Sequence, residues 1–495
     1  MDIKELNDQE QVRREKLAKY RELGIDPFGH SYKISHQISD IRQICEKKSA
    51  KAIEKLSLEV SVAGRIKAIR RMGKASFVNI TDKTGNIQAY IGIDVIGEKS
   101  YEVFRLADIG DIIGLKGRIM TTRTGELTIR VSKYTHLTKC LHPLPEKFHG
   151  LTDIEERSRR RYLDLIVNDD SKNIAFARPQ IIRSIQHFLD GKGFVEVETP
   201  VLNPILGGAN ARPFITHHNT LDRNFYLRIA TELPLKRLLV GGMEKVYEIG
   251  HMFRNEGMDA SHNPEFTSIE IYEAYSDLKK IGTLTEKMIR SVAKEITGSA
   301  TIEYQGKIID FKKPFRWVSM NDLIKEKTGV DFANDIKTFE EAKAIADQHH
   351  IHLDKFKNTI GYVMNEVYEE LCQGELIQPT FVYSYPIEVS PLTKKGKDPR
   401  FTERFELFVN GKELGNAYTE LNDPIDQKER FLSQLKAKEL GDDEANEMDD
   451  DFIEALEYGM PPAGGVGLGV DRLVMLLTNQ ASIREVILFP TMKDR

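Results

Sequence analysis

The chain is poor in the features that mark secreted, membrane-spanning and disulfide-stabilised proteins. Its three cysteines, Cys45, Cys140 and Cys372, lie far apart and form no CxxC pair, which argues against a disulfide framework and a cysteine zinc site. No apolar run reaches the roughly 20 residues that a membrane helix needs, and the mixed-charge start lacks the apolar stretch of a signal peptide. We therefore expect a cytoplasmic protein with reduced thiols and no membrane segment.

Of two common nucleotide-binding motifs, one is absent and the other is only weakly indicated. No P-loop (GxxxxGK[ST]) occurs, and Gly464–Gly469 is followed by only 26 residues, too few for the βαβ unit of a dinucleotide fold. The next segment, Val470–Leu477, reads as a helix, which places Arg472 at a helix N-terminus suited to a phosphate. His349, His350 and His352 have no carboxylate or cysteine at ligand spacing, so a surface helix end is favoured over a metal site.

Charge and length indicate several folding units and a polyanionic partner. The net charge of the 495 residues is −5, yet basic residues gather in the first third, as in Arg65–Lys74 and Arg157–Arg161. A basic region on an acidic chain suits a polyanion that touches one end. The length exceeds one hydrophobic core and suggests about three folding units.

The first third predicts a helical extension and a small barrel. Residues 1–57 form the extension, with a helix over Asp8–Leu23 that Asp8 and Gln11 begin as a capping box. Residues 58–142 alternate as five short strands with a helical interruption near Glu102–Leu106, a pattern typical of the five-stranded OB-fold β-barrel. Such barrels stack bases on aromatic side chains over a basic groove. Phe77 could serve this way or could be core. The predicted strands are Val60–Ile66, Ala75–Ile80, Ile87–Ile91, Asp111–Ile119 and Leu127–Val131.

The rest of the chain predicts one large α+β domain. We interpret residues 143–172 as a linker, because they are rich in charge and carry Pro143 and Pro145. Residues 173–495 contain helices followed by runs of strands, which favours an antiparallel sheet. A helical insertion is expected at about residues 335–378. The predicted fold class is therefore multidomain α+β.

A strand, a loop and a returning strand bring charged side chains together in this domain. Phe253–Glu256 leads into a turn-rich loop that ends at Phe266, and Thr267–Glu273 returns. Alternation places Glu270 and Tyr272 on one side. Carboxylates, an aromatic ring and Arg254 on one sheet face are unusual for a core and typical of a substrate floor.

Three segments together resemble class II aminoacyl-tRNA synthetases. Phe253–Glu256 with its loop and Phe266 resembles their motif 2, and Gly467–Arg472 resembles motif 3. The predicted helix Ile181–Leu189, followed by Gly193–Pro200, resembles motif 1, which builds the dimer interface in that family. The resemblance covers essentially the whole chain. It implies a homodimeric, ATP-dependent ligase, and the barrel implies the subgroup for aspartate, asparagine and lysine.

Charge then indicates the amino acid. The positions that resemble the family's amino-acid pocket include the carboxylates Glu232, Glu270 and Glu420. Buried carboxylates need a cation as much as a buried ammonium needs an anion, so such a pocket favours lysine over neutral or acidic side chains. By resemblance, Glu232 takes the α-ammonium, whereas Glu270, Tyr272 and Glu420 hold the ε-ammonium. The resemblance also places Gly208, Arg254, Asn416, Tyr418 and Gly467 in this pocket.

The resemblance further implies how ATP is held. Arg254 bridges the lysine carboxylate and the α-phosphate, and Arg472 is the second catalytic arginine, lying over the adenine. Glu256 reads the adenine amino edge and Phe266 stacks on the base. His262, next to Asn263 in the ATP site, contacts the outer phosphates. Some relatives carry a basic residue immediately before this histidine, where the present chain has Ser261.

The remaining implied sites bind metal and tRNA. Glu406 and Glu413 lie in one predicted hairpin, and the resemblance implies that they hold Mg²⁺ against ATP. In the barrel, Phe77, Gln88 and Glu126 fall where the anticodon of tRNA-Lys is read, by stacking and by hydrogen bonds to a uridine.

Other functions remain possible on the sequence alone. Aspartyl- or asparaginyl-tRNA synthetases share the fold but need cations in the amino-acid pocket. A non-catalytic tRNA-binding paralogue would be expected to lose Arg254, Arg472 or the Glu406 and Glu413 pair, and all four are present. A truncated relative that lysylates protein would lack the barrel.

Overall fold

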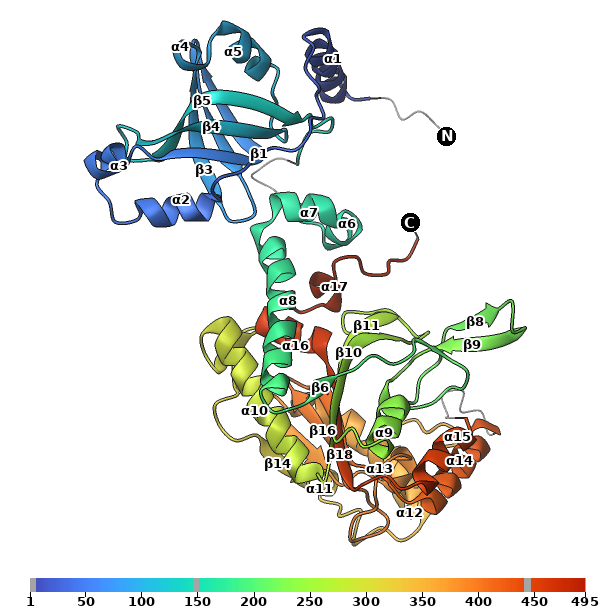
Figure 1. Cartoon of the computed structure of the whole chain (residues 1–495). Helices are drawn as coiled ribbons and strands as arrows, with labels where there is room; N and C mark the ends of the chain where they lie inside the picture. Colours follow the sequence, from blue (N-terminus) through green and yellow to red (C-terminus); the bar gives the residue numbers. More distant parts are fainter. Residues whose placement is uncertain (1–5, 146–150, 440–446, 495) are drawn as a thin grey trace. The chain divides into compact units, whose positions relative to one another are not determined.

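The computed structural model describes residues 6–145, 151–439 and 447–494, and the chain divides into two compact units, Met1–Leu151 and Thr152–Arg495. Figure 1 shows both units coloured along the sequence. Part of the predicted linker, residues 146–150, lies outside the described residues.

The first unit is a closed five-stranded barrel with helices around it. Its strands follow the order β1-β2-β3-β5-β4, and β1 also pairs with β4, which closes the barrel. The inward side chains alternate along each strand, as for Val78 and Ile80 on β2. The strands are β1 (Glu59–Met72), β2 (Ala75–Thr81), β3 (Asn86–Gly92), β4 (Ile112–Thr121) and β5 (Leu127–Thr138). The helices are α1 (Asp8–Glu22), α2 (Ile38–Cys45), α3 (Ala50–Leu56), α4 (Ile93–Ile96) and α5 (Glu98–Arg105).

The start of α1 differs from the prediction by one residue. Asn7, not Asp8, is the N-cap: its side chain accepts the backbone N–H of Glu10 at 2.9 Å, and Glu10 accepts the N–H of Asn7 at 3.1 Å. The predicted capping box of Asp8 with Gln11 was therefore wrong, because Asn7 is the last residue with extended backbone and either side chain can cap. The helix docks on its own unit through Tyr20, which stacks on His136 with ring centroids 4.1 Å apart.

The second unit is built on an eight-stranded, mainly antiparallel sheet of order β14-β15-β16-β17-β18-β11-β10-β6. Only the two outer pairs, β14 with β15 and β10 with β6, run parallel. The predicted fold class is confirmed. The sheet strands are β6 (Val195–Glu196), β10 (Lys245–Phe253), β11 (Glu265–Ala274), β14 (Arg316–Ser319), β15 (Thr380–Tyr383), β16 (Arg404–Val409), β17 (Lys412–Thr419) and β18 (Ala463–Gly469). Smaller sheets contain β7 (Leu202–Asn203), β8 (Ile215–His218), β9 (Arg223–Leu227), β12 (Thr301–Tyr304) and β13 (Lys307–Asp310).

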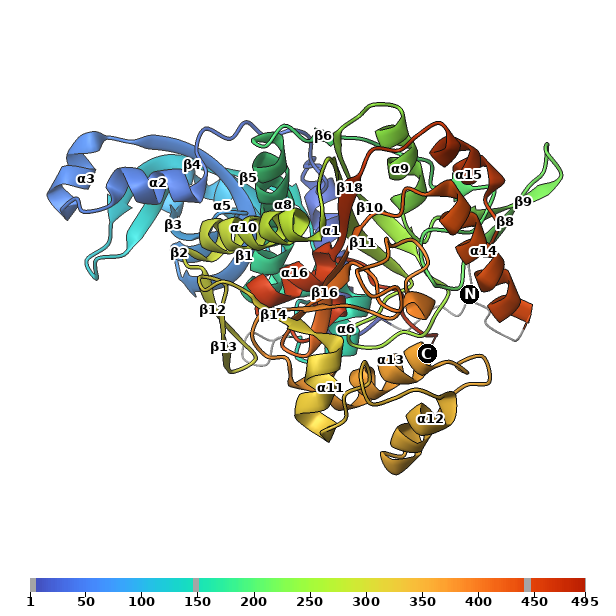
Figure 2. The ribbon, with the colours of Figure 1, turned by 90° about the horizontal axis from the view of Figure 1, so that it is seen from below.

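Helices cover both faces of this sheet. Figures 1 and 2 show α8 and α10 side by side, and these two pack with α16 on one face. On the other face α9, α14 and α15 form a smaller core. The helices are α6 (Ile154–Arg159), α7 (Arg161–Val167), α8 (Asp169–Asp190), α9 (Glu232–Val240), α10 (Leu278–Thr297), α11 (Met320–Thr328), α12 (Phe339–Gln348), α13 (Ile360–Leu371), α14 (Pro424–Glu439), α15 (Asp450–Glu457), α16 (Val470–Leu477) and α17 (Ile483–Val486), with short 3-10 turns η1 (Gln373–Glu375) and η2 (Ile387–Val389).

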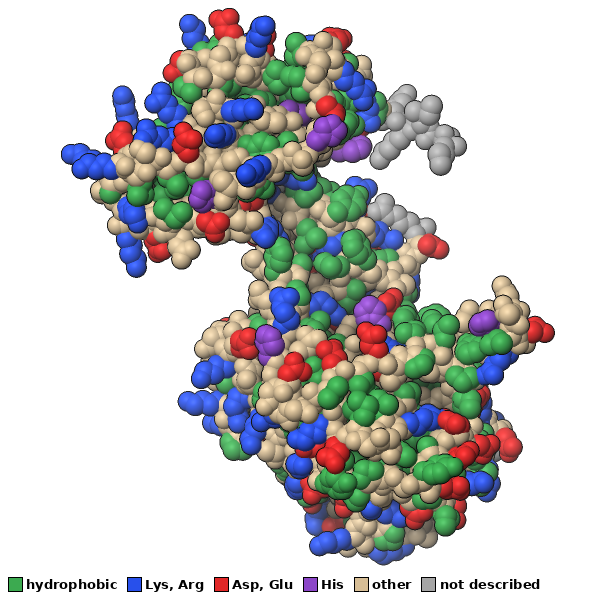
Figure 3. Space-filling view, viewed as in Figure 1, with side chains coloured by type: hydrophobic (Ala, Val, Ile, Leu, Met, Phe, Trp, Pro, Cys, Tyr) green, Lys and Arg blue, Asp and Glu red, His purple; other side chains and the backbone are tan. Residues whose placement is uncertain are grey.

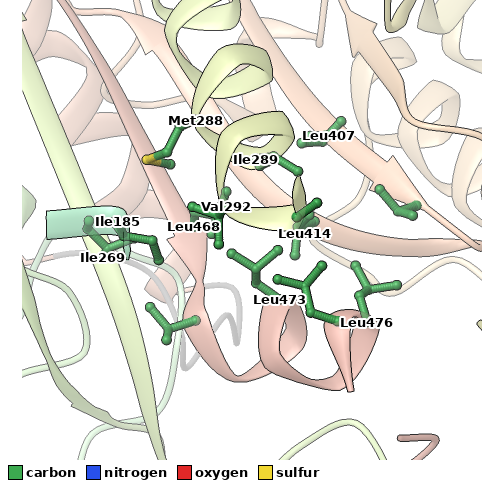
Figure 4. Close-up of a cluster of buried hydrophobic side chains, with 14 of the residues drawn as sticks. Ile185, Ile269, Met288, Ile289, Val292, Leu407, Leu414, Leu468, Leu473 and Leu476 are labelled. Atoms are coloured by element: carbon green, nitrogen blue, oxygen red, sulfur yellow. The ribbon is translucent and has the colours of Figure 1, made fainter. Parts of the chain in front are cut away.

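The alternation of each central strand divides core from site. Ile269, Leu407 and Leu468 point into the core beneath α10 and α16, together with Met288 and Leu473 (Figure 4). The residues next to them on β11, β16 and β18 therefore face the opposite side of the sheet. That side carries the predicted site residues.

One expectation about the chain between these elements needs revision. Residues 152–172 do not form an extended linker, since they contain α6, α7 and the start of α8 and belong to the second unit. The predicted insertion contains α12 and α13, which share a separate core with α11. None of the helices in the described residues combines the length and apolar composition needed to cross a membrane.

Candidate active site

A hollow of about 360 Å³ lies on the face of the large sheet opposite α10 and α16. Its floor comes from alternating positions of neighbouring strands: Glu270 and Tyr272 on β11, and Asn416 and Tyr418 on β17. Between them β18 places Gly465, Gly467 and Gly469 at the hollow, and Gly467 pairs with both Glu270 and Asn416. Side chains from two strands, β11 and β17, thus converge over the bare backbone of β18.

The glycines of β18 keep this hollow open. A Cβ atom at Gly465 would collide with the side chains of Tyr272 and Glu420, and one at Gly467 would contact the Cγ of Glu270. Gly208, at the rim, has φ +91°, a conformation that favours glycine, and its neighbours are Ala230 and Glu232. The glycine-rich segment therefore forms the floor of the hollow.

Three buried carboxylates form the acidic end of the hollow. Glu232 begins α9, Glu270 lies on β11, and Glu420 follows β17; they are 5%, 7% and 0% exposed. Glu232 and Glu270 line the hollow, whereas Glu420 lies behind its wall, next to Gly465 and Tyr272. The fold brings the three predicted carboxylates to one region, although Glu420 is deeper than the other two.

Each of these carboxylates has a defined environment. Glu270 accepts the backbone N–H of Thr231 at 2.8 Å and the hydroxyl of Tyr272 at 3.0 Å. Burial, followed by the nearby charge of Glu232, raises the pKa of Glu270 to about 7. Glu232 and Glu420 each contact the ammonium of Lys236, at 2.6 and 2.5 Å. Burial raises the pKa of both carboxyls, and Lys236 acts against that rise.

The opposite end of the hollow carries cationic and aromatic groups from the loop between β10 and β11. Arg254 and Glu256 lie just beyond the end of β10 and both line the hollow. The Arg254 guanidinium lies over the Phe266 ring, 5.2 Å from its centroid, and its buried Nε has no hydrogen-bond partner in the described part of the chain. A cation held on an aromatic ring with a free donor is well placed for an anionic ligand.

His262 and Asn263 are the other predicted residues of that loop. His262 is exposed, its Nδ1 lies 2.8 Å from Asp259, and its Nε2 lies 3.5 Å from Arg472. Asn263 is buried, donates to the carbonyl of Glu265 at 2.6 Å and accepts the N–H of Thr491 at 3.2 Å. Both line the hollow, but the Asn263 amide is engaged in holding the loop.

A second pair of carboxylates lies near Arg472. Glu406 accepts from Arg404 at 2.6 Å and from the hydroxyl of Tyr385 at 2.9 Å, while Glu413 lies 3.5 Å from Arg472. Burial is the main cause that raises the pKa of Glu406, and the charge of Glu413 adds to the rise. Two carboxylates that repel one another suit a divalent cation. In the described residues no group of three or more His, Cys, Asp or Glu side chains forms a metal cluster.

One ion pair links α8, β11 and α16 close to the three segments that resembled motifs 1, 2 and 3. Arg178 of α8 is paired with Asp471 of α16 and donates to the hydroxyl of Thr267 at 2.8 Å. Asp471 in turn accepts the backbone N–H of Thr267 at 2.7 Å. The floor strand β11 is thereby tied to two helices on its core side.

The predicted anticodon residues lie in the barrel unit. Phe77 on β2 is half-buried on the outer surface, with its ring 5.4 Å from that of Tyr90. Gln88 on β3 is buried: it donates to Thr128 at 2.9 Å and accepts from Arg70 at 3.3 Å. Glu126 is exposed in the turn before β5. Phe77 is therefore available for stacking, while the Gln88 amide is already hydrogen-bonded at both ends.

Two charged residues of the site were missed. Arg404 lines the hollow and holds both Glu406 and Asn416, the latter at 3.1 Å. It precedes Glu406 by two residues on β16, so the alternation used for Glu270 and Tyr272 could have found it. Lys236 follows Glu232 by four residues, a helical spacing that indicates a pair. Nothing in the sequence indicates its second partner, Glu420.

Comparisons with known proteins agree with this geometry. Residues 153–493 match the family model described as tRNA synthetases class II (D, K and N), and residues 60–137 match an OB-fold nucleic acid binding domain. The chain is 55% identical to a lysine–tRNA ligase of Lactococcus lactis subsp. cremoris (strain MG1363), over 99% of this chain and 100% of that protein. It is 52% identical to the lysine–tRNA ligase of Bacillus subtilis (strain 168), over 99% of this chain and 98% of that protein. The aspartate and asparagine alternatives are not favoured. The chain belongs to the class II tRNA synthetases and, within them, to the lysine–tRNA ligases.

Proposed function

We propose that this ATP-dependent lysine–tRNA ligase activates lysine in the hollow on the large sheet. The ammonium groups of lysine bind at the acidic end, where Glu232 takes the α-ammonium and Glu270, Tyr272 and Glu420 hold the ε-ammonium. The lysine carboxylate and the ATP α-phosphate then meet at Arg254. The observation that carries the assignment is the clustering of three buried carboxylates opposite a guanidinium with an unused donor.

Charge explains how the chain accelerates adenylate formation. A carboxylate oxygen of lysine attacks the α-phosphorus, and pyrophosphate leaves; two anions must therefore approach each other. Arg254 offsets that repulsion and the negative charge of the transition state. Phe266 stacks on one face of the adenine, and Arg472 lies over the other face. Glu256 accepts a hydrogen bond from the adenine amino group. His262 and Asn263 line the outer-phosphate end of the same hollow.

Glu406 and Glu413 fit a Mg²⁺ ion bound with ATP. Their mutual repulsion and the burial of Glu406 favour a divalent cation. When bound, Mg²⁺ would neutralise phosphate charge. Arg404 orients Glu406, and Arg472, paired with Glu413, orients the second carboxylate.

The second step transfers lysine to tRNA-Lys. A terminal ribose hydroxyl attacks the adenylate carbonyl, AMP leaves, and no protein nucleophile is required. The barrel would read the anticodon by stacking a base on Phe77. For Gln88 to hydrogen-bond a uridine, its amide must exchange or share the contact with Arg70. Glu126 is free to contact a second position.

Exposed apolar side chains support a homodimer built on the segment that resembled motif 1. Figure 3 shows exposed hydrophobic side chains on the second unit. They include Tyr162 on α7, Phe176 on α8, Val195 on the edge strand β6, and Leu202 on β7. Exposed apolar side chains of this kind are typical of an interface between identical chains. Sedimentation should give a mass twice that of the chain, and Phe176→Asp should lower that mass.

The three unpaired cysteines support a cytoplasmic location.

Amino-acid-dependent ATP–pyrophosphate exchange tests the central proposal. Each of the twenty amino acids is supplied in turn, and exchange is expected with lysine alone. Exchange with aspartate or asparagine, or none with lysine, would refute the pocket assignment. An Arg254→Ala variant should lose exchange by a factor of about 100 or more, the usual cost of losing one donor to the transition state.

A further inference from the structure

Lys236 places an ammonium of the chain's own behind the wall of the hollow, beside the carboxylates proposed to bind an ammonium ligand. It lies on α9, one helical turn after Glu232, and its side chain is fully buried. Its Nζ lies 2.6 Å from Oε1 of Glu232 and 2.5 Å from Oε2 of Glu420, and donates to the carbonyl of Leu392 at 3.4 Å. Two of these contacts are hydrogen bonds, to Glu232 and Leu392, and the third is an ion pair with Glu420, so the ammonium is held among three oxygens of the chain itself.

The charges at this end of the hollow balance only if Lys236 is counted. When the three carboxyls are ionised, Glu232, Glu270 and Glu420 with Lys236 leave two negative charges, and bound lysine brings two ammonium groups. The other charged group nearby, Arg404, is paired with Glu406, and burial keeps the hydroxyls of Tyr272 and Tyr418 protonated by raising their pKa. Without Lys236 one buried carboxylate would have no cation, which is costly.

We propose that Lys236 is a specificity-determining positioning residue of lysine activation. It holds one oxygen of Glu232 and one of Glu420, directs the second oxygen of each to the bound amino acid, and sets the pocket to accept two positive charges. The inference rests on the proposed binding of lysine in this hollow. Its geometric support is Oε1 of Glu420, which is buried beside Tyr272 and Gly465 and accepts no hydrogen bond from any described residue.

Loss of the Lys236 charge should make lysine binding depend on pH. The charge of Lys236 lowers the pKa of Glu232 and of Glu420 against the effect of burial. Without it the two carboxyls, held close together, would share a proton. Lysine would have to displace that proton, so its KM would rise as the pH falls.

The test compares Lys236→Met, which keeps the chain length, with Lys236→Arg, which keeps the charge. Lysine-dependent ATP–pyrophosphate exchange is measured from pH 6.5 to 9. For Lys236→Met the KM for lysine should rise about 100-fold at pH 7, the order expected for a broken buried ion pair. The plot of log KM for lysine against pH should become steeper by about one log unit per pH unit. The kcat and the KM for ATP should stay within about twofold of those of the unaltered enzyme. Lys236→Arg should keep the slope of the unaltered enzyme.

A matched control is Lys280→Met, because Lys280 is half exposed and its partner Glu273 also contacts Lys245 at 3.0 Å. That variant should keep the unaltered KM and slope. The inference would be overturned if Lys236→Met and the unaltered enzyme had equal slopes, or if the Met and Arg variants behaved alike. It would also be overturned if Lys236→Met lowered kcat and raised the KM values for lysine and ATP alike, together with a lower Tm. If Lys236→Met does not fold, Lys236→Gln replaces it, since it keeps hydrogen-bond donors without charge. Absence of lysine-dependent exchange by the unaltered enzyme would refute the proposed function instead.

Discussion

Glu270 allows the lysine pocket to be tested through charge and through pH. Glu270→Gln keeps the volume and the acceptor for the Thr231 N–H, and removes one negative charge. Burial, with the charge of Glu232, raises the pKa of Glu270 to about 7, so in the free enzyme the carboxyl is half ionised near that pH. An ammonium binds the ionised form. The KM for lysine should therefore rise as the pH falls below about 7, approaching tenfold per unit.

The size of the effect follows from the burial. Loss of one buried carboxylate partner weakens the binding of an ammonium by about 3 kcal/mol. This corresponds to a rise in KM of roughly 100-fold, at about 1.4 kcal/mol per tenfold. Glu270→Gln should show this full increase at pH 8. At pH 6 the unaltered enzyme has itself lost about tenfold through protonation, so the difference should shrink to about tenfold.

The assay is lysine-dependent ATP–pyrophosphate exchange from pH 6 to 8.5, with the KM for ATP as an internal reference. Glu273→Gln is the matched control: the residue lies on the same strand, is paired with Lys245 and Lys280, and does not line the hollow. A Glu270→Gln KM within threefold of the unaltered value at pH 8, or two parallel pH curves, would refute the reasoning.

Three further predictions concern the barrel, the metal and the framework. Phe77→Ala should raise the KM for tRNA in charging about 5- to 150-fold, the worth of one stacked base at about 1–3 kcal/mol, and leave exchange unchanged; equal loss in both assays would contradict the anticodon role. Glu413→Gln should raise the Mg²⁺ concentration for half-maximal exchange about tenfold, with excess Mg²⁺ restoring the rate; an unshifted Mg²⁺ curve would count against the metal pair. Arg178→Ala leaves Asp471 buried without its cation, at a cost of about 3 kcal/mol. Calorimetry should therefore show a lower Tm. An unchanged Tm would show that this ion pair does not stabilise the contacts of α8 with β11 and α16.

Alternation along single strands accounts for the part of the site that the sequence could predict. Residues two apart share a face, so Glu270 and Tyr272 were grouped before any strand was paired, whereas Asn416 and Tyr418 were assigned to the pocket by the family resemblance. The order of the strands in the sheet could not be predicted in this way. β18 lies between β11 and β17, although nearly 200 residues separate Glu270 from Gly467 in the chain, and only long-range packing selects that arrangement.

Local signals were less reliable where two solutions cost about the same. Asn7 and Asp8 can both cap a helix, and the choice depends on which residue keeps an extended backbone. The segment 152–172 looked like a linker because it is highly charged, yet Arg161 is fully buried and paired with Asp164 at 2.5 Å. Charge predicts exposure only when no partner is available, and partners are set by the fold.

Burial also decides what a familiar sequence pattern means. A Glu and a Lys four residues apart on an exposed helix contribute about 0.2–0.5 kcal/mol, and Glu232 with Lys236 would be read that way from the sequence. In the folded chain both are buried and a second carboxylate, Glu420, comes from a distant strand. The same two residues then set the charge of a pocket instead of supporting a helix surface. Selection for lysine thus depends on a cation that the substrate never replaces, and a search for substrate ligands alone would pass over it.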